Sequence, residues 1–212
     1  MKPLKYLLYQ PTGDVQDVYP LVIFLHGIGE RGDDLNRVKK WGLPRYAESG
    51  EVALPAYLVA PQCPDDVHWS DIPDRLDAML DELLANYPID ADRVYLTGFS
   101  MGSFGTWRWS LRRPERFAAL LPVGGNGYWS VFALEHFDFT PLKSIPLWMV
   151  HGALDAAVPV AGADEFAAAL VAVGANFGYT RYPDANHGES CDRAFIDRTI
   201  LNWLLAQKRG SS

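Results

Sequence analysis

The segment Arg93–Ser103, RVYLTGFSMGS, decides the fold. Its first half is a short apolar run typical of a buried strand, and residues 101–112 follow it with the pattern of a helix. Between the two lies the G-x-S-x-G pentapeptide Gly98-Phe99-Ser100-Met101-Gly102. After a strand and before a helix, this pentapeptide forms a nucleophile elbow, a turn so tight that it needs both glycines and strains the serine at its tip. Outside that context it would be an ordinary glycine-rich turn, so the flanking elements predict Ser100 as a nucleophile.

Short apolar runs alternate with longer amphipathic segments along the rest of the chain. This alternation indicates strands and helices around a mostly parallel sheet, and continuous runs such as LVIFL and LWMV indicate strands covered on both faces. Together with the elbow, the pattern predicts the α/β class and the α/β-hydrolase fold, with a mostly parallel central sheet flanked by helices. We expect strands at residues 6–9, 21–26, 56–60, 93–98, 118–123, 147–151 and 177–182, and helices at residues 73–86, 101–112, 164–173 and 192–206.

The length and composition fit a single domain over residues 1–212. Of the 212 residues, 49% are hydrophobic and 21% are charged, which argues against disorder. Residues 124–143 form the one long irregular connection, so we expect a minimal core without a large lid.

The formal net charge is -7, from 26 acidic and 19 basic residues. Such a surface repels phosphate backbones and anionic lipid, so we expect neither a nucleic-acid partner nor a membrane partner. No apolar stretch approaches the roughly 20 residues that cross a bilayer. The opening MKPLKYLLYQP predicts a first strand, because Tyr9-Gln10-Pro11 ends its apolar patch early. This favours a cytoplasmic location, with secretion as the alternative if a signal peptide was removed.

The two cysteines, Cys63 and Cys191, are too few for a disulfide framework and lack the spacing of a metal site. We expect two buried or half-buried thiols. A bridge between them stays open as an alternative, because the predicted fold places both near the same rim of the sheet. We expect no metal.

A serine hydroxyl is a weak nucleophile at neutral pH and needs a base, which a carboxylate must orient. In this fold the acid and then the histidine follow the serine along the chain, which excludes His26 and His68. His136 precedes any candidate acid, and we interpret His151, at the tip of the strand LWMV, as a structural histidine beside the site. His187 remains, in the loop before the final helix, where this fold carries its base.

The acid is expected in the loop after the preceding strand. Asp155 lies there, in His151-Gly152-Ala153-Leu154-Asp155, and Val158-Pro159 then leads into the next helix. Asp184 is the rival because it is close to His187 in sequence, but the loop would have to fold back on itself to join them. We therefore predict Asp155 as the acid.

The oxygen of a tetrahedral intermediate needs hydrogen-bond donors that are in place beforehand. One donor is the amide after the nucleophile, that of Met101. The other is expected in the loop after LVIFL, which reads His26-Gly27-Ile28-Gly29, where flanking glycines let the chain turn the Ile28 amide inwards.

Several motifs occur here in one order: FLHGIGERGDD, APQCP followed by His68-Trp69, GFSMGSFGTW, the run at residues 113–117, and HGALDAAVP. Together they resemble the small bacterial esterases of the phospholipase/carboxylesterase-like and "predicted peptidase" branch, relatives of feruloyl esterases and polyhydroxybutyrate depolymerases. The resemblance extends from Tyr6 to Trp203. It implies ester hydrolysis without a large cap and without a cofactor, and it implies the residue set already derived, namely Ser100, Asp155 and His187 with Ile28 and Met101 as oxyanion donors.

Two positions depart from that family pattern. Ser103 stands where these enzymes usually have a further glycine, and His187 is followed by Gly188-Glu189-Ser190-Cys191, where an aromatic residue often walls the pocket. These changes bear on substrate shape and leave the chemistry alone.

Trp69 follows a strand on the active-site side, so we expect it to bind substrate as a pocket wall, with packing in the core or a loop as the alternative. Glu30 and Arg31 follow the expected oxyanion loop. They either pair with each other or brace that loop, or they form a solvated surface pair.

The sequence thus predicts a serine carboxylesterase that hydrolyses small-molecule esters with short acyl or phenolic groups through an acyl-enzyme. A thioesterase, an amidase or an acyltransferase on the same triad is the alternative, because all of them use the same nucleophile. A non-enzymatic binding protein is disfavoured, since such proteins typically lose a triad member. The sequence indicates no oligomeric state.

Overall fold

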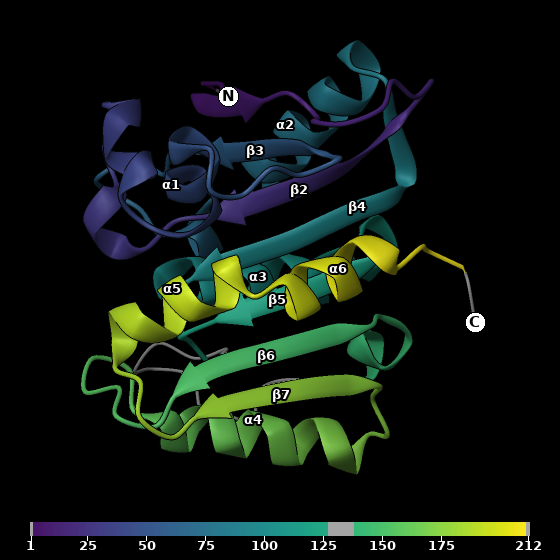
Figure 1. Ribbon diagram of the computed structural model, residues 1–212. Helices are drawn as coiled ribbons and strands as arrows, with labels where there is room; N and C mark the ends of the chain where they lie inside the picture. The colour runs from purple at the N-terminus through teal and green to yellow at the C-terminus, as the bar shows by residue number, and fades with distance from the viewer. Residues whose placement is uncertain (1, 127–137, 211–212) are drawn as a thin grey trace.

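In the computed structural model, which describes residues 2–126 and 138–210, seven strands form one sheet in the order β1-β3-β2-β4-β5-β6-β7 (Figure 1). Strand β1 is antiparallel to β3, and every other pairing is parallel. The mostly parallel sheet of the predicted α/β-hydrolase fold is therefore confirmed. The strands are β1 (Tyr6–Tyr9), β2 (Tyr19–Leu25), β3 (Tyr57–Pro61), β4 (Ile89–Phe99), β5 (Ala119–Val123), β6 (Leu147–Gly152) and β7 (Phe177–Tyr182).

Helices cover both faces of the sheet. One face carries α1 (Gly42–Ser49), α5 (His187–Ile196) and α6 (Arg198–Ala206), and the other carries α2 (Pro73–Asn86), α3 (Met101–Arg112) and α4 (Val160–Ala172) (Figure 1). Within β2, Leu21 and Ile23 pack on the α2–α3–α4 face while Val22 and Phe24 pack on the other. Alternate residues therefore fill two separate cores, which is why this strand reads as a continuous apolar run.

Short 3₁₀ helices lie in the connections: η1 (Ile28–Glu30), η2 (Leu35–Lys40), η3 (Trp69–Asp71), η4 (Pro114–Arg116) and η6 (Thr140–Ser144). Residues 127–137, within the connection expected at 124–143, lie outside the described residues, as does His136. No helix in the described ranges combines the length and apolar character needed to span a membrane.

Three helices differ from the sequence prediction. Helix α1 was not expected, because eight residues reading GLPRYAES give too short a pattern. Helix α4 begins at Val160, directly after Pro159. The single helix expected at residues 192–206 is two helices, because Asp197 adopts extended backbone angles and its side chain accepts a hydrogen bond from the Thr199 amide, so it caps α6.

Cys63 and Cys191 are both buried and free. Cys63 belongs to the core on the α2–α3–α4 face of the sheet, whereas Cys191 belongs to the core on the opposite face. The sheet therefore separates the two thiols, and the alternative of a bridge is wrong.

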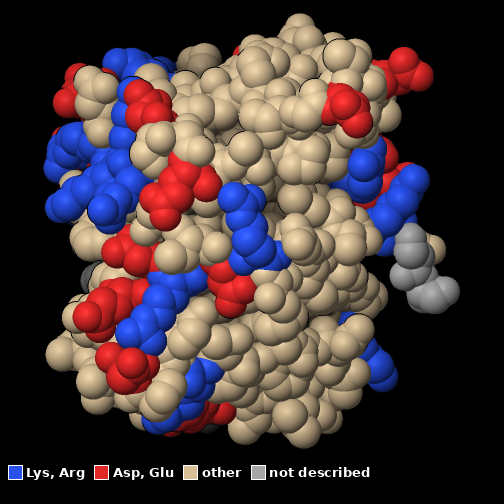
Figure 2. All heavy atoms as spheres, in the orientation of Figure 1, with Lys and Arg blue, Asp and Glu red and all other residues tan. Residues whose placement is uncertain are grey.

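Acidic and basic side chains are interspersed on the face shown in Figure 2, and many of them gather on the left, where the parallel strands end. Lys39 of η2 and Glu48 of α1 form one exposed pair at 2.8 Å, and Arg45 of α1 and Asp192 of α5 form another at 3.3 Å. Pairs so exposed contribute little stability and keep the charge of this face mixed.

Candidate active site

Ser100 is the single residue between β4 and α3, and it has φ 56° and ψ -118°. In the described part of the chain it is the only residue other than glycine with a positive φ. Glycines are required on both sides, because a Cβ at Gly98 would clash with the Gly102 backbone and one at Gly102 would clash with the Leu25 carbonyl. This is the strained turn that the sequence predicts, and it holds the serine at the carboxyl end of the central strand.

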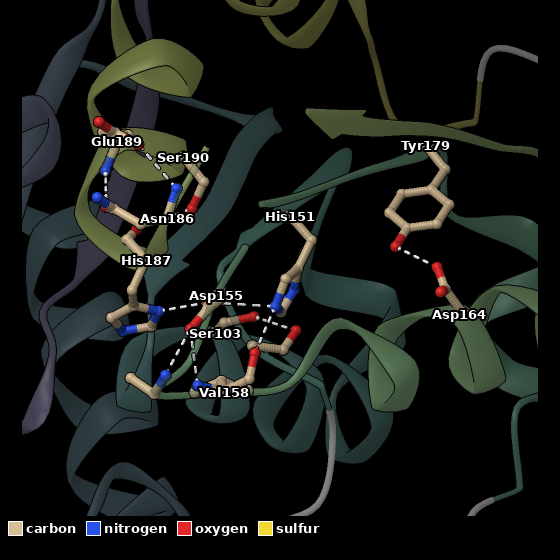
Figure 3. A network of polar contacts seen from close by, with 12 residues as sticks. Ser103, His151, Asp155, Val158, Asp164, Tyr179, Asn186, His187, Glu189 and Ser190 are labelled. Carbon is tan, nitrogen blue, oxygen red and sulfur yellow. Dashed lines mark hydrogen bonds and ion pairs between the residues drawn. The ribbon is translucent and has the colours of Figure 1, made fainter. Parts of the chain in front are cut away.

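Asp155 lies in the loop after β6 and is buried. The Ala157 and Val158 amides donate to its Oδ1 at 2.9 and 2.8 Å, and His187 Nδ1 lies 2.6 Å from its Oδ2 (Figure 3). Burial would raise the pKa of Asp155, but hydrogen bonds from His151, His187 and the Val158 amide outweigh it and hold the pKa well below its usual range. The carboxylate is therefore ionised at neutral pH.

His187 is the first residue of α5 rather than a loop residue, because Asn186 and Glu189 form a capping box that starts the helix there. Its side chain is 22% exposed, so solvent and small molecules reach the ring. The ring packs on Phe99, the neighbour of Ser100, with 4.6 Å between centroids. Since Nδ1 binds the carboxylate, Nε2 is the nitrogen free to accept a proton.

No hydrogen bond joins the hydroxyl of Ser100 to the imidazole of His187 in this arrangement of the two described side chains. Catalytic hydrogen bonds are often long in unliganded enzymes and tighten when substrate binds. The direct contact between these two groups therefore stays a prediction.

His151 is buried at the end of β6 and lies on the other side of the Asp155 carboxylate (Figure 3). Its Nε2 is 2.9 Å from the Val158 carbonyl oxygen and 3.3 Å from Asp155 Oδ2. A proton on Nε2 can serve both acceptors and hold the Asp155–Val158 turn closed. The position agrees with a structural histidine beside the site.

The rival acid lies elsewhere. Asp184 is exposed, and its two carboxylate oxygens bind Arg193 at 2.6 and 3.3 Å. His187 therefore contacts Asp155 and not Asp184. His68, which the order of the triad along the chain excludes as the base, caps the short helix η3 together with Asp71.

The two expected oxyanion donors are both first residues of helices, Met101 in α3 and Ile28 in η1. The first amides of a helix have no partner within it and are available to a ligand. The segment that carries Ile28 lies against the serine, since a Cβ built on Gly27 would be 3.6 Å from Ser100 Cβ. We refer to residues 26–30 as the β2 loop.

The expectation that Trp69 walls the substrate pocket is wrong in this structure. Its side chain is 1% exposed in the core beneath α3, and its Nε1 donates to the His26 carbonyl oxygen at 2.9 Å. Trp69 therefore offers almost no surface to a substrate. The alternative of core packing describes it.

Glu30 and Arg31 do not form a solvated pair. Arg31 donates to the Ile28 carbonyl at 3.2 Å and to the Val67 carbonyl at 3.2 Å, so it braces the β2 loop. Glu30 is buried, and this burial raises the pKa of its carboxyl. The positive charges of Lys40 and Arg37 lower the pKa, but by less than burial raises it.

The sequence did not single out Trp41, whose half-buried ring lies beside Phe99 and the start of α5. It lies 5.9 Å from the Phe99 ring, and the far end of the indole would be 3.0 Å from a Cβ at Gly188. The small residue after His187 thus leaves room for an aromatic ring from another element. A lone tryptophan before Gly-Leu-Pro carried no signal of this role.

His26, excluded as the base, is fully buried in the β2 loop. Burial lowers the pKa of His26 to about 4, the hydrogen bond to the Gly27 carbonyl acts in the opposite direction, and the charges of Arg31 and Arg37 lower it further. The imidazole is therefore neutral at neutral pH.

We expect this neutral histidine to make folding sensitive to moderate acid. The unfolded chain binds a proton at the ordinary pKa of 6.5 and the folded chain only at about 4. The contribution is thus complete above pH 6.5 and is lost as the pH falls towards 4, reducing the free energy of unfolding by about 3 kcal/mol. Denaturant titrations from pH 7.5 to 4.5 measure it. The dependence should weaken in His26→Gln and persist in His68→Gln, and equal slopes in all three proteins would contradict it.

Among residues 2–126 and 138–210, no group of three or more His, Cys, Asp or Glu side chains is arranged to hold a metal ion. What the site brings together is a buried carboxylate, an accessible imidazole and a serine on a strained turn.

Residues 62–198 match the family model described as phospholipase/carboxylesterase. The putative esterase NocK of Nocardia uniformis subsp. tsuyamanensis is 29% identical over 168 residues, which are 73% of this chain and 45% of NocK. Poly(3-hydroxyalkanoate) depolymerase C of Paucimonas lemoignei is 42% identical over 50 residues, 24% of this chain and 12% of that protein. A solved thermostable esterase is 31% identical with a TM-score of 0.80, covering 97% of this chain and 60% of the other. The chain thus spans less than half the length of the two curated relatives.

Proposed function

The chain belongs to the phospholipase/carboxylesterase family, and on that premise we propose that it is a serine carboxylesterase acting on small-molecule esters. The observation that carries the proposal is the 2.6 Å bond between Asp155 and His187 beside the strained Ser100 turn. Ester hydrolysis by acyl transfer needs a nucleophile, a base and a group that orients the base. These three side chains have those roles.

The reaction has two steps. His187 Nε2 takes the Ser100 proton as Oγ attacks the ester carbonyl, and a tetrahedral intermediate forms. The protonated histidine then gives this proton to the leaving alcohol, which leaves an acyl-enzyme on Ser100. A water molecule, deprotonated by the same histidine, attacks the acyl-enzyme, and the acid and the free serine are released.

Asp155 acts on the base and not on the substrate. Its carboxylate keeps the proton of the neutral imidazole on Nδ1, so that Nε2 presents its lone pair, and it stabilises the charge when Nε2 is protonated. Its own pKa is held low, so it stays an anion throughout. The amides of Ile28 and Met101 bind the oxyanion of each tetrahedral intermediate.

The substrates that we propose are esters with short acyl or phenolic groups. The relatives include a putative esterase and a depolymerase of a polymeric ester, so ester hydrolysis is the chemistry their names share. Trp41, whose half-buried ring packs beside Phe99, brings an apolar surface to the site, which suits an acyl chain or an aromatic ring.

Thioester hydrolysis, amide hydrolysis and acyl transfer use the same three groups and are the alternatives. The test is a parallel assay with a matched acyl group on p-nitrophenol, on a thiol and on an aniline, extended from acetyl to palmitoyl and including methyl ferulate. We expect kcat/KM to be highest for the oxygen esters and to fall for long chains. A higher kcat/KM for the thioester would replace the proposal by a thioesterase.

A binding protein without activity is the second alternative. A fluorophosphonate probe distinguishes it, because the probe phosphonylates only a serine that a neighbouring base activates. We expect labelling of one serine, Ser100, and an unlabelled protein would contradict the enzymatic proposal.

A further inference from the structure

The β2 loop has an unusual set of hydrogen bonds: each of its five successive backbone carbonyls accepts one from a side chain. The pairs are His26 O with Trp69 Nε1 at 2.9 Å, Gly27 O with His26 Nδ1 at 2.6 Å, Ile28 O with Arg31 Nε at 3.2 Å, Gly29 O with Arg37 Nη2 at 2.8 Å, and Glu30 O with Gln62 Nε2 at 2.9 Å. Loop carbonyls more often bind water or other backbone groups. Here Trp69 of η3, Arg37 of η2 and Gln62 after β3 bind three of them. His26 of the loop itself and Arg31 directly after it bind the other two.

Fixing a carbonyl also fixes the amide on the same peptide. In a planar trans peptide, the C=O of one residue and the N–H of the next point in opposite directions. The peptide whose oxygen binds His26 Nδ1 carries the Ile28 amide, and the peptide before it is fixed by Trp69. The expected oxyanion donor is therefore held by side chains that lie behind it.

His26 uses both ring nitrogens for this purpose. Nδ1 donates to the Gly27 carbonyl, so Nε2 carries a lone pair and accepts from the Cys63 amide at 3.0 Å. The Gly32 amide in turn donates to the Cys63 carbonyl at 2.9 Å. The imidazole is thus a rigid bridge between the β2 loop and the segment that follows β3.

We propose that His26 and Trp69 are positioning residues that preorganise the oxyanion hole, a proposal that rests on the esterase function proposed above. They do not touch the substrate. They keep the Ile28 peptide in the orientation that an oxyanion requires, so their loss weakens binding of the tetrahedral intermediate more than binding of the ester. This role also accounts for the motifs His68-Trp69 and APQCP, which the catalytic groups alone leave unexplained.

Two other buried tryptophans provide matched controls. Trp107 is fully buried on α3, and its Nε1 has no hydrogen-bond partner. Trp109 is similarly buried, and its Nε1 donates to Asp77 of α2 at 2.8 Å. Replacement of each by phenylalanine removes a similar volume, but only Trp69→Phe removes a bond to the β2 loop.

The experiment compares the three Trp→Phe variants with the unaltered protein. The readouts are kcat and KM for p-nitrophenyl acetate, the inhibition constant of phenylboronic acid, and thermal unfolding. Phenylboronic acid forms a tetrahedral adduct with serine, so its binding reports on the oxyanion hole. We expect Trp69→Phe to lower kcat about tenfold and raise the boronate inhibition constant about tenfold, with KM changed less than twofold. Trp107→Phe and Trp109→Phe should change kcat less than twofold, even if they lower the temperature of thermal unfolding.

Three results would overturn the inference: equal kcat for Trp69→Phe and Trp107→Phe, a rise in KM with kcat unchanged, or an equal loss of kcat in Trp109→Phe. Each would mean that Trp69 acts through packing or through the pocket. The proposed function is tested separately by the Ser100→Ala variant. If that variant keeps the turnover of the unaltered protein, both the proposed function and this inference are wrong.

A second pair of variants keeps the test independent of Trp69. In His26→Asn the side-chain amide nitrogen takes the place of Nδ1 and keeps the bond to the Gly27 carbonyl, while the bond from Cys63 is lost. In His26→Gln the amide oxygen takes the place of Nε2, and the bond to Gly27 is lost. We expect His26→Asn to retain about tenfold more kcat than His26→Gln at equal stability. The reverse order would contradict the role of the Gly27 bond.

Discussion

Replacement of Ser100 by alanine is expected to lower kcat for p-nitrophenyl acetate by at least ~10⁴-fold, because no other described group at the site can form the acyl-enzyme. The Asp155–His187 bond does not involve the serine and should persist. Alanine keeps the Cβ that causes the backbone strain, so the free energy of unfolding should change by less than about 1 kcal/mol. Initial rates with short esters and thermal unfolding measure the two effects.

The matched control is Ser110→Ala on the same helix. Ser110 is fully buried and its hydroxyl donates to the Trp107 carbonyl at 3.1 Å, within the helix and away from the strained turn. We expect kcat to stay within twofold there. Turnover by Ser100→Ala above a hundredth of the normal rate, after removal of contaminating esterase, would mean that another group is the nucleophile.

Replacement of Asp155 by asparagine should lower kcat by about 10³- to 10⁴-fold with a small change in KM. The carboxylate receives four donors, from His187, His151 and the amides of Ala157 and Val158. An asparagine offers one oxygen to them and turns its own NH₂ group towards the other donors. If the asparagine NH₂ group faces His187, Nδ1 of the ring must accept a hydrogen bond from it. The imidazole proton then sits on Nε2, and Nε2 can no longer take a proton from the serine.

Asp184→Asn is the control for this prediction, since it makes the same change of charge at the rival acid, three residues before His187. Asp184 is exposed and binds Arg193, so its loss should alter kcat/KM less than twofold. Rates for both variants from pH 6 to 9 complete the test. Equal losses in the two variants, or recovery of Asp155→Asn at high pH, would show that Asp155 does not set the tautomer of His187.

Much of the fold could be predicted because the hydrophobic pattern of a parallel sheet is strong. Strands such as β2 are buried on both faces, and α2 has a clear apolar stripe. Helix α1 could not be predicted, because it is short and its stability comes from packing on the sheet and on α5. The break between α5 and α6 depends on a single cap at Asp197. The apolar residues keep their helical spacing across this break, so their pattern does not indicate it.

The candidate site divides in the same way. The elbow at Ser100 has a local signature, since the turn itself requires its two glycines. The positions of Asp155 and His187 followed from the order of elements, which the fold fixes. The role of Trp69 could not be read from the sequence, because whether an indole faces a pocket or the core depends on the elements above it. The Trp41 ring meets Gly188 only through the packing of α1 against α5, which is a contact between distant parts of the chain.

The positive φ of Ser100 has a consequence for how this protein can be improved. A glycine would adopt the same backbone angles without strain. The serine therefore lowers the free energy of unfolding by about 1–3 kcal/mol relative to a glycine at this position. Because Ser100 is the proposed nucleophile, laboratory evolution for heat resistance alone would favour molecules that have glycine at this position and lack the proposed activity. Any programme that seeks a hardier catalyst from this chain must select for turnover and for stability in the same round.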